Sequence, residues 1–422
     1  MTFPIFDGLP DRAQPTVQVK LVDAGELYVG WRWEHRLADT RAVVLPRAQV
    51  QPLLDELAMA LPTPFAGESV AEALRRSLTN GPLRDPTTEI DLMTRLAQAV
   101  IPQELAGELN LVLAGGMRPH VRIQPSWSTG QVPWEALCVD VDGERFVDNG
   151  DLSVLPPATV RNAPERRVSP WRPDAPVVGV LDPALPGFGD ASDLGSVLGP
   201  VPVDSPLRAM VAGWGDRAVT APAGATDRST VFRRRDVDRD ALSAMLAGAG
   251  RLVYLGHVTT AEYGLDARLH LSCGPDTTGR AALVGPHRPL TAADLVLGHR
   301  PGTPGGWTMP NRVALIGCES GGEVRFAEPV GLVAAAIHSG AEYVTATRWT
   351  LPTDTGLRRF VPGAELAGAL PDLVAAVDAT HRSDAPVAAL NAWQRDQAAA
   401  WHRTGAIEHS PVMWGALSTT YG

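Results

Sequence analysis

Hydrophobic positions in the first part of the chain change from an alternating to a helical period. Residues 16–22 and 27–34 partly alternate with polar side chains and flank Asp23-Ala24-Gly25, which predicts a β-hairpin. Apolar side chains then recur at helical spacing over 50–61, which predicts an amphipathic helix. Residues 1–165 are therefore expected to form an α+β module, with further helices at 69–78 and 88–99, strands at 40–45, 110–113 and 121–124, and a second hairpin over 138–155.

After a Pro- and Arg-rich linker over residues 156–176, the hydrophobic pattern is different. Residues 177–181, 251–257 and 312–316 are apolar runs of the kind found in strands that are buried on both faces. A similar strand is expected at 342–347. Helical patterns stand between these runs, at 206–211, 238–246 and 330–338. Strands alternating with helices predict an α/β domain over 166–422, with a mostly parallel central sheet and helices on both faces.

Two of the predicted buried strands end in the same way, in Gly256-His257 and in Gly317-Cys318. If these strands are parallel neighbours, both side chains emerge at the carboxyl edge of one sheet, where α/β proteins bind ligands. A His within hydrogen-bond reach can activate a thiol and later protonate a leaving amine. The pattern predicts Cys318 as a nucleophile and His257 as its base. The backbone N–H groups of Val258 and Cys318 are the expected oxyanion hole.

Each of these two residues also has a structural interpretation. A lone Cys after a strand is more often a small buried hydrophobe, and a lone His is more often a satisfied structural residue. The matching strand ends favour chemistry, because two independent buried residues need not share one edge. The His comes first and the Cys follows about sixty positions later, which is the order and approximate spacing of caspases.

Composition excludes several classes of protein. The 422 residues are 45% hydrophobic and 20% charged, as in ordinary globular proteins, and the net charge of −10 argues against a nucleic-acid or acidic-membrane surface. No apolar run reaches the roughly 18–20 residues that span a bilayer. Residues 1–11 lack the pattern of a secretory signal. We therefore expect no membrane or nucleic-acid partner.

Lysine and cysteine usage narrows the chemistry further. Lys20 is the only lysine and lies in no Gly-rich loop, so a Walker P-loop and a Schiff-base mechanism are excluded. Cys138, Cys273 and Cys318 are odd in number and widely spaced, which favours a reducing, cytoplasmic setting over a disulfide framework. His270 and Cys273 could join His257 in a metal set, but no fourth ligand is evident. We expect neither a metal nor an organic cofactor.

Several motifs follow the order seen in the CHAT-domain family, and the chain resembles that family over roughly residues 100–422. The most specific segment is Ala-Leu-Ile-Gly-Cys-Glu-Ser-Gly at 314–321. The supporting segments are Pro-Trp-Glu at 133–135, Tyr-Leu-Gly-His at 254–257, Leu-His-Leu-Ser at 269–272, Leu-Thr-Ala-Ala-Asp-Leu at 290–295, Glu-Pro-Val-Gly-Leu at 328–332, Val-Thr-Ala-Thr-Arg-Trp at 344–349 and Pro-Val-Met-Trp-Gly-Ala at 411–416.

The resemblance implies a cysteine endopeptidase with a caspase-like and separase-like α/β fold, and it assigns His257 as base and Cys318 as nucleophile. CHAT domains often belong to bacterial conflict and cell-death systems. The expected substrate is accordingly another protein, cut at few sites. An activating partner protein or ligand is also expected, because loops over 182–203 and 273–290 have flexible compositions.

The chain departs from the family pattern at two places. Val258 follows the His where the family usually has Gly, which crowds the expected oxyanion side. Asp354 lies five positions after Trp349, whereas the family acid comes after three or four. In separase-like members an acid in this stretch receives a basic P1 side chain. Asp354, Glu319 and Trp349 are thus candidates for specificity, with loop capping as the alternative for Asp354.

Two other functions stay open on the sequence. Val258 favours a catalytically weak or inactive CHAT-like scaffold that binds a partner protein without cutting it. A small-molecule hydrolase or transferase could use the same dyad, although no motif for such a substrate is present. Reactivity of the Cys318 thiol separates the enzyme from the scaffold.

Overall fold

The fold comes from a computed structural model, which describes residues 8–9, 13–140, 143–259, 264–300, 302, 305–317, 330–361 and 368–422. The chain divides into two compact units. Unit 1 comprises Met1–Leu61, Arg76–Leu155 and Val387–Ser418, and unit 2 comprises Pro62–Arg75, Pro156–Pro386 and Thr419–Gly422. The change at Pro156 falls at the start of the predicted linker. The two shorter exchanges, at 62–75 and 387–418, are not visible in the hydrophobic pattern.

Unit 1 is built on a sheet with the strand order β3-β2-β1-β4-β5. The predicted hairpin is confirmed, because β1 and β2 pair antiparallel around Gly25, whose φ of 77° suits a residue without a Cβ. Strand β4 continues the sheet parallel to β1, and β5 is parallel to β4. The strands are β1 (Thr16–Ala24), β2 (Glu26–Trp33), β3 (Thr40–Leu45), β4 (His120–Gln124) and β5 (Asp151–Val154).

The helices of unit 1 agree with most of the predicted amphipathic segments. Helix α3 is capped by Asp85, whose side chain accepts the N–H groups of Thr87 and Thr88. The regular segments are α1 (Arg47–Ala60), a π-turn (Arg76–Asn80), α3 (Pro86–Val100), α4 (Gln103–Ala114), α5 (Phe146–Asn149), α14 (Pro411–Trp414) and α13 (Pro386–Thr404), whose first residue belongs to unit 2. Short 3₁₀ turns lie at Pro82–Arg84, Trp127–Thr129, Trp134–Ala136 and Ile407–His409.

Two secondary-structure predictions in unit 1 are wrong. Residues 110–113 form the end of α4, because Leu105, Leu109 and Val112 recur at helical spacing on its buried face. Among the described residues of 138–155, the predicted hairpin is reduced to one antiparallel bridge, Cys138–Arg145, followed by α5. At the end of this bridge, the buried Arg145 guanidinium forms a bidentate ion pair with another buried residue, Glu89.

Unit 2 contains the predicted parallel sheet, with the strand order β13-β12-β8-β6-β7. All four pairings within this order are parallel, which confirms the predicted fold class. The strands are β6 (Val177–Leu181), β7 (Ala218–Val219), β8 (Arg251–Gly256), β12 (Arg312–Gly317) and β13 (Tyr343–Thr347). Beside β13 runs β14 (Leu417–Tyr421), whose last three residues belong to unit 2. A small antiparallel sheet is formed by β9 (Val258–Thr259), β10 (Arg268–Leu269) and β11 (Leu290–Thr291).

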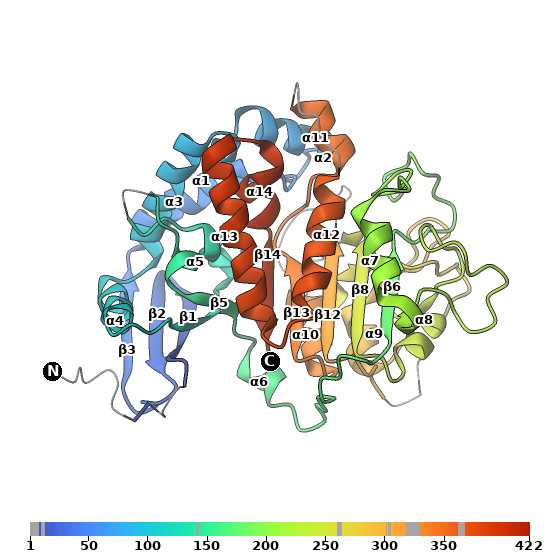
Figure 1. Ribbon diagram of the computed structural model, residues 1–422, viewed down its shortest axis with the longest axis horizontal. Coiled ribbons are helices and arrows are strands. Elements are labelled where there is room, and N and C mark those ends of the chain that lie inside the picture. The colour runs from blue at the N-terminus through green and yellow to red at the C-terminus, as the bar shows by residue number, and fades with distance from the viewer. Residues whose placement is uncertain are drawn as a thin grey trace. The chain divides into compact units, whose positions relative to one another are not determined.

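Helices cover both faces of the unit 2 sheet. On one face α7 (Pro206–Trp214) packs beside α12 (Ala369–Thr380) (Figure 1). The Trp214 ring lies against Gly179 of β6. On the other face α8 (Arg239–Leu246), α9 (Ala292–Leu297) and α10 (Val330–His338) share one apolar core with the strands. Alternate strand residues supply the two faces, as in any sheet covered on both sides. Short helices α2 (Val70–Arg75), α6 (Ala158–Arg161) and α11 (Asp354–Phe360), and 3₁₀ turns at Gly215–Arg217 and Gly264–Asp266, complete the unit.

No helix among the described residues is long and apolar enough to cross a bilayer.

Candidate active site

The two Gly-terminated strands are direct neighbours. Strands β8 and β12 pair in parallel, with Leu255 opposite Ile316 and Gly256 opposite Gly317. The expectation that these strands are parallel neighbours is confirmed, and they end in register at the carboxyl edge of the sheet. His257 follows Gly256 at this edge. Cys318 and Glu319, the predicted nucleophile and one specificity candidate, lie outside the described residues.

The imidazole of His257 is buried and oriented by a loop carbonyl. Its side chain is 6% exposed, and its Nε2 lies 2.8 Å from the carbonyl oxygen of Gly195. A carbonyl oxygen only accepts, so Nε2 carries the proton in this hydrogen bond. In the neutral ring this tautomer leaves the lone pair on Nδ1. The nitrogen that can accept a proton from a reacting group is therefore Nδ1.

Two hydrogen bonds hold the backbone carbonyl of His257. The hydroxyl of Tyr254 donates to the carbonyl of His257 at 2.8 Å, and His270 N–H donates to the same carbonyl at 3.2 Å. The second bond makes Val258 and Leu269 a non-hydrogen-bonded pair of the β9–β10 ladder. The N–H of Val258 thus points away from β10, as a donor to an oxyanion must.

The side chain of Val258 packs against the glycine that ends the facing strand. A Cβ placed on Gly317 lies 2.8 Å from the Cβ and 2.9 Å from a methyl of Val258, closer than two carbon atoms pack. The Thr347 hydroxyl donates to the Gly317 carbonyl at 3.4 Å. The side chain of Val258 thus occupies the space that a side chain at position 317 would need.

A directional chain of hydrogen bonds lies behind His257. His287 Nδ1 donates to the carbonyl of Cys273 at 2.9 Å, so its Nε2 accepts from His270 Nδ1 at 3.1 Å, and His270 Nε2 accepts from the Thr259 hydroxyl at 3.0 Å. Burial lowers the pKa of His287 to about 4 and holds the pKa of His270 well below its usual value. Both rings are neutral, and this series of hydrogen bonds holds the small sheet together.

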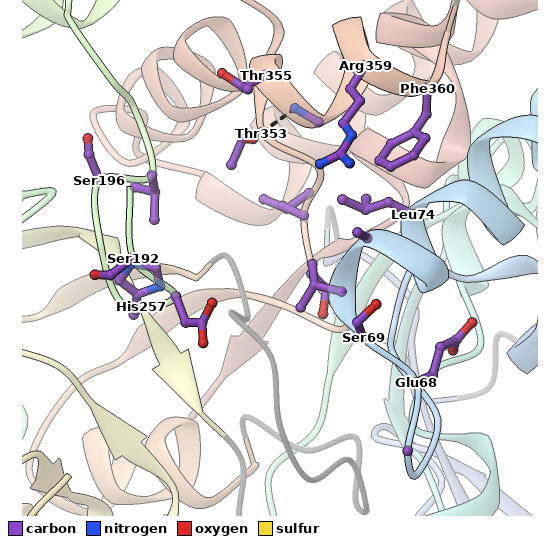
Figure 2. A pocket seen from close by; sticks show the side chains of 18 residues that line it. Glu68, Ser69, Leu74, Ser192, Ser196, His257, Thr353, Thr355, Arg359 and Phe360 are labelled. Carbon is purple, nitrogen blue, oxygen red and sulfur yellow. Dashed lines mark hydrogen bonds between the residues drawn. The ribbon is translucent and has the colours of Figure 1, made fainter. Parts of the chain in front are cut away.

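An open cavity of about 720 Å³ lies beside His257, and all of its lining residues belong to unit 2. In Figure 2, Ser192, Ser196 and His257 form one side, Ser69 and Leu74 of the segment 67–74 form the other, and Arg359 extends from α11 into the space between. The charged lining residues are Glu68, Asp193 and Arg359. This arrangement can accept an extended segment of chain next to the imidazole.

The predicted specificity residues Asp354 and Trp349 are both described, and neither lines this cavity. Asp354 is the first residue of α11, and its Oδ1 accepts the N–H of Leu370 at 3.0 Å. Trp349 is 4% exposed. The cavity is lined by neighbours of these residues in sequence, Thr350 and Leu351 after Trp349, and Thr353 and Thr355 on either side of Asp354.

Two residues of the site were not predicted from the sequence. Asp182 follows strand β6, is 1% exposed and receives the N–H of Val197 at 3.0 Å, and Gly195 supplies the carbonyl that faces His257. The only signal was an Asp directly after a buried strand, in Asp182-Pro183. Such an Asp marks the carboxyl edge of a sheet, but nothing in the sequence connects it with His257.

Comparison with known proteins identifies the family of this chain. A family model described as the CHAT domain matches residues 91–420. Two crystal structures of the Saccharomyces cerevisiae separase–securin complex are similar to the chain, one with 11% identity and a TM-score of 0.48, covering 99% of this chain and 30% of that one, and the other with 10% identity and a TM-score of 0.42, covering 96% and 30%. The chain thus spans about 30% of the length of those separase chains, and no curated protein matches it. Because the family model covers most of the sequence, the protein belongs to the CHAT-domain family.

Proposed function

We propose that the protein is a cysteine endopeptidase in which Cys318 is the nucleophile and His257 the base. The observation that carries the proposal is the register of β8 and β12, which ends both strands at one edge with Gly256 opposite Gly317. Cys318 and His257 are the next residues of these strands in the sequence. The tautomer set by Gly195 supports the same roles, since it leaves Nδ1 of His257 able to accept the thiol proton.

The proposed reaction has two steps. In the first step the Cys318 thiolate attacks the peptide carbonyl carbon, and the resulting oxyanion accepts hydrogen bonds from the N–H groups of Val258 and Cys318. His257 then protonates the leaving amine as the C–N bond breaks. Water then attacks the thioester, giving up a proton to His257, and the C–S bond breaks to release the carboxylate product and regenerate the thiol. No metal or organic cofactor takes part in this scheme.

The proposed substrate is a protein cut at few sites, within a bacterial defence or regulated cell-death system of the cytoplasm. Support comes from the family and from the open cavity beside His257, which suits an extended segment. We retain Asp354, Glu319 and Trp349 as proposed specificity residues. For Asp354, a competing role at the start of α11 is supported by its bond to Leu370. Activation by a partner protein or ligand is part of the proposal.

Thiol reactivity tests the dyad without a known substrate. Cys138 and Cys273 are buried, and burial raises the pKa of both thiols, to about 11 for Cys138. At neutral pH, iodoacetamide should therefore modify Cys318 in the native protein while sparing the two internal controls, as measured by peptide mass spectrometry. His257→Ala should slow that modification. Once a substrate is found, Cys318→Ala should abolish its cleavage.

The rival function is a CHAT-like scaffold that binds a partner without cutting it. The contact between Val258 and Gly317 favours this reading, because it narrows the space at the strand ends. A scaffold predicts that the three cysteines are modified only after denaturation, with no effect of His257→Ala. That outcome would show the protease proposal to be wrong.

A further inference from the structure

Asp182 is placed between the strand that carries His257 and the loop that orients it. Asp182 follows β6 directly, and its N–H donates to the carbonyl of Leu255 in β8 at 2.6 Å. Its φ of 52° lies in the left-handed region, which Asp adopts more readily than most residues. The unusual backbone turns the chain out of the sheet at the level of Gly256, one residue before His257.

The carboxylate of Asp182 holds the loop by three hydrogen bonds. Oδ1 accepts the N–H of Val197 at 3.0 Å, and Oδ2 accepts the hydroxyl of Ser196 and, at 3.4 Å, the N–H of Leu198. The Asp182 side chain is buried, so each unmade bond leaves a desolvated polar group. These three hydrogen bonds hold residues 196–198 against the end of β6.

The residue just before this segment is the one that faces the imidazole. The carbonyl of Gly195 accepts from His257 Nε2 at 2.8 Å, and Arg233 Nη1 reaches the same oxygen at 3.4 Å. The same Arg233 nitrogen lies 3.5 Å from Asp182 Oδ1. The contacts thus form a closed circuit. Asp182 bonds to β8 and to the loop, and Gly195 of the loop bonds to His257, which directly follows β8.

We propose that Asp182 is a positioning residue for the base, one that fixes the tautomer and orientation of His257 through the carbonyl of Gly195. The inference rests on the proposed function for its catalytic consequence. The inference also assigns a role to the loop over residues 182–203, which has a flexible composition. The buried carboxylate of Asp182 binds the middle of this loop to the edge of the sheet. Ordering of the loop and ordering of the base are then one event.

Asp182→Asn tests this role, because it keeps the size of the side chain while removing its charge and one acceptor. Asp204→Asn, an exposed carboxylate at the far end of the same loop, is the matched control. Two readouts are used: the pH dependence of Cys318 alkylation by iodoacetamide, and the ¹⁵N NMR signature of the His257 tautomer, assigned with His257→Gln. The tautomer signature of the folded protein does not change when a substitution only lowers global stability.

We expect Asp182→Asn to slow alkylation at pH 7 on the order of tenfold, the effect of about one pKa unit on the thiolate fraction. We also expect the His257 signals to lose the dominant Nε2–H tautomer. Asp204→Asn should match the wild type in both readouts. If Asp182→Asn does not fold, Ser196→Ala, which removes one of the three bonds, should shift both readouts in the same direction by a smaller factor.

Two outcomes overturn the inference: alkylation profiles and tautomer signals of a folded Asp182→Asn that coincide with those of the wild type, or, where that variant does not fold, unchanged readouts in Ser196→Ala. A wild-type protein whose Cys318 is unreactive contradicts the proposed function instead. The tautomer measurement decides the role of Asp182 even then, because it needs only His257.

Discussion

A close contact at the strand ends makes Gly317→Ala a sharp test of the site geometry. The added methyl falls 2.8 Å from the Cβ and 2.9 Å from a methyl of Val258, and 3.6 Å from its nitrogen. Neither clashing atom is the far end of a flexible chain, so the strand ends must separate. Overpacking of this kind costs about 1–3 kcal/mol of unfolding free energy. It also displaces the Val258 N–H that the proposed oxyanion hole uses.

Removing the Val258 side chain should abolish most of this cost. In Val258→Gly both clashing atoms are gone, and the nearest remaining atom, the nitrogen at 3.6 Å, is in ordinary contact. A double-mutant cycle of Gly317→Ala with Val258→Gly should therefore give a coupling of about 1–3 kcal/mol. Urea unfolding of the four proteins measures it. Gly30→Ala is the control, since an added methyl there meets only a carbonyl at 3.6 Å.

The cycle also has a functional readout. Gly317→Ala should slow Cys318 alkylation at neutral pH, and the double variant should recover part of the rate. The reasoning is refuted if Gly317→Ala costs the same unfolding free energy with Val or with Gly at position 258. That result would mean that the cost comes from the glycine backbone itself rather than from the contact.

Three further predictions concern charge and burial. Glu89→Ala should cost about 3–5 kcal/mol of unfolding free energy, because it leaves the buried Arg145 without its carboxylate partner. The control Arg95→Ala, on the same helix, removes exposed ion pairs and should cost about 0–1 kcal/mol. Equal shifts of the urea midpoint in the two variants would contradict this prediction. The pKa of His287 is about 4 in the folded state and about 6.5 unfolded, so stability is present above pH 6.5 and is lost as the pH falls toward 4, by about 3 kcal/mol. His287→Gln should remove this part of the acid dependence, and unfolding free energies at pH 7.5 and 5 measure the difference. Asp354→Asn should lower the cleavage of substrates with a basic P1 side chain relative to neutral ones if it is a specificity residue; an unchanged ratio with reduced stability would assign it to the start of α11.

Local patterns predicted the parts of this protein that depend on neighbours in sequence. Strands β6, β8 and β12 are apolar runs because both faces of the sheet are covered, so the burial is readable residue by residue. The hairpin of β1 and β2 followed from alternation around a turn with glycine. The same logic failed at residues 110–113, where a short apolar run ended a helix rather than forming a strand.

Long-range contacts account for the larger errors. Where the hairpin predicted over 138–155 ends early, at the Cys138–Arg145 bridge, Arg145 pairs with Glu89, 56 positions away. No periodicity reports such a pair, because its energy comes from desolvation and charge rather than from the local backbone. The assignment of residues 62–75 to unit 2 and of residues 387–418 to unit 1 likewise depends on contacts between residues far apart in the sequence.

The sequence by itself determined which chemical groups end the two central strands. A Gly-His and a Gly-Cys after buried apolar runs follow from hydrophobic pattern alone, and their register needed only the pairing of β8 with β12. The tertiary structure alone decided how His257 is held. The carbonyl that sets its tautomer lies 62 positions away, in a loop held by Asp182, because a buried imidazole and a buried carboxylate must each find partners wherever the folded chain brings them.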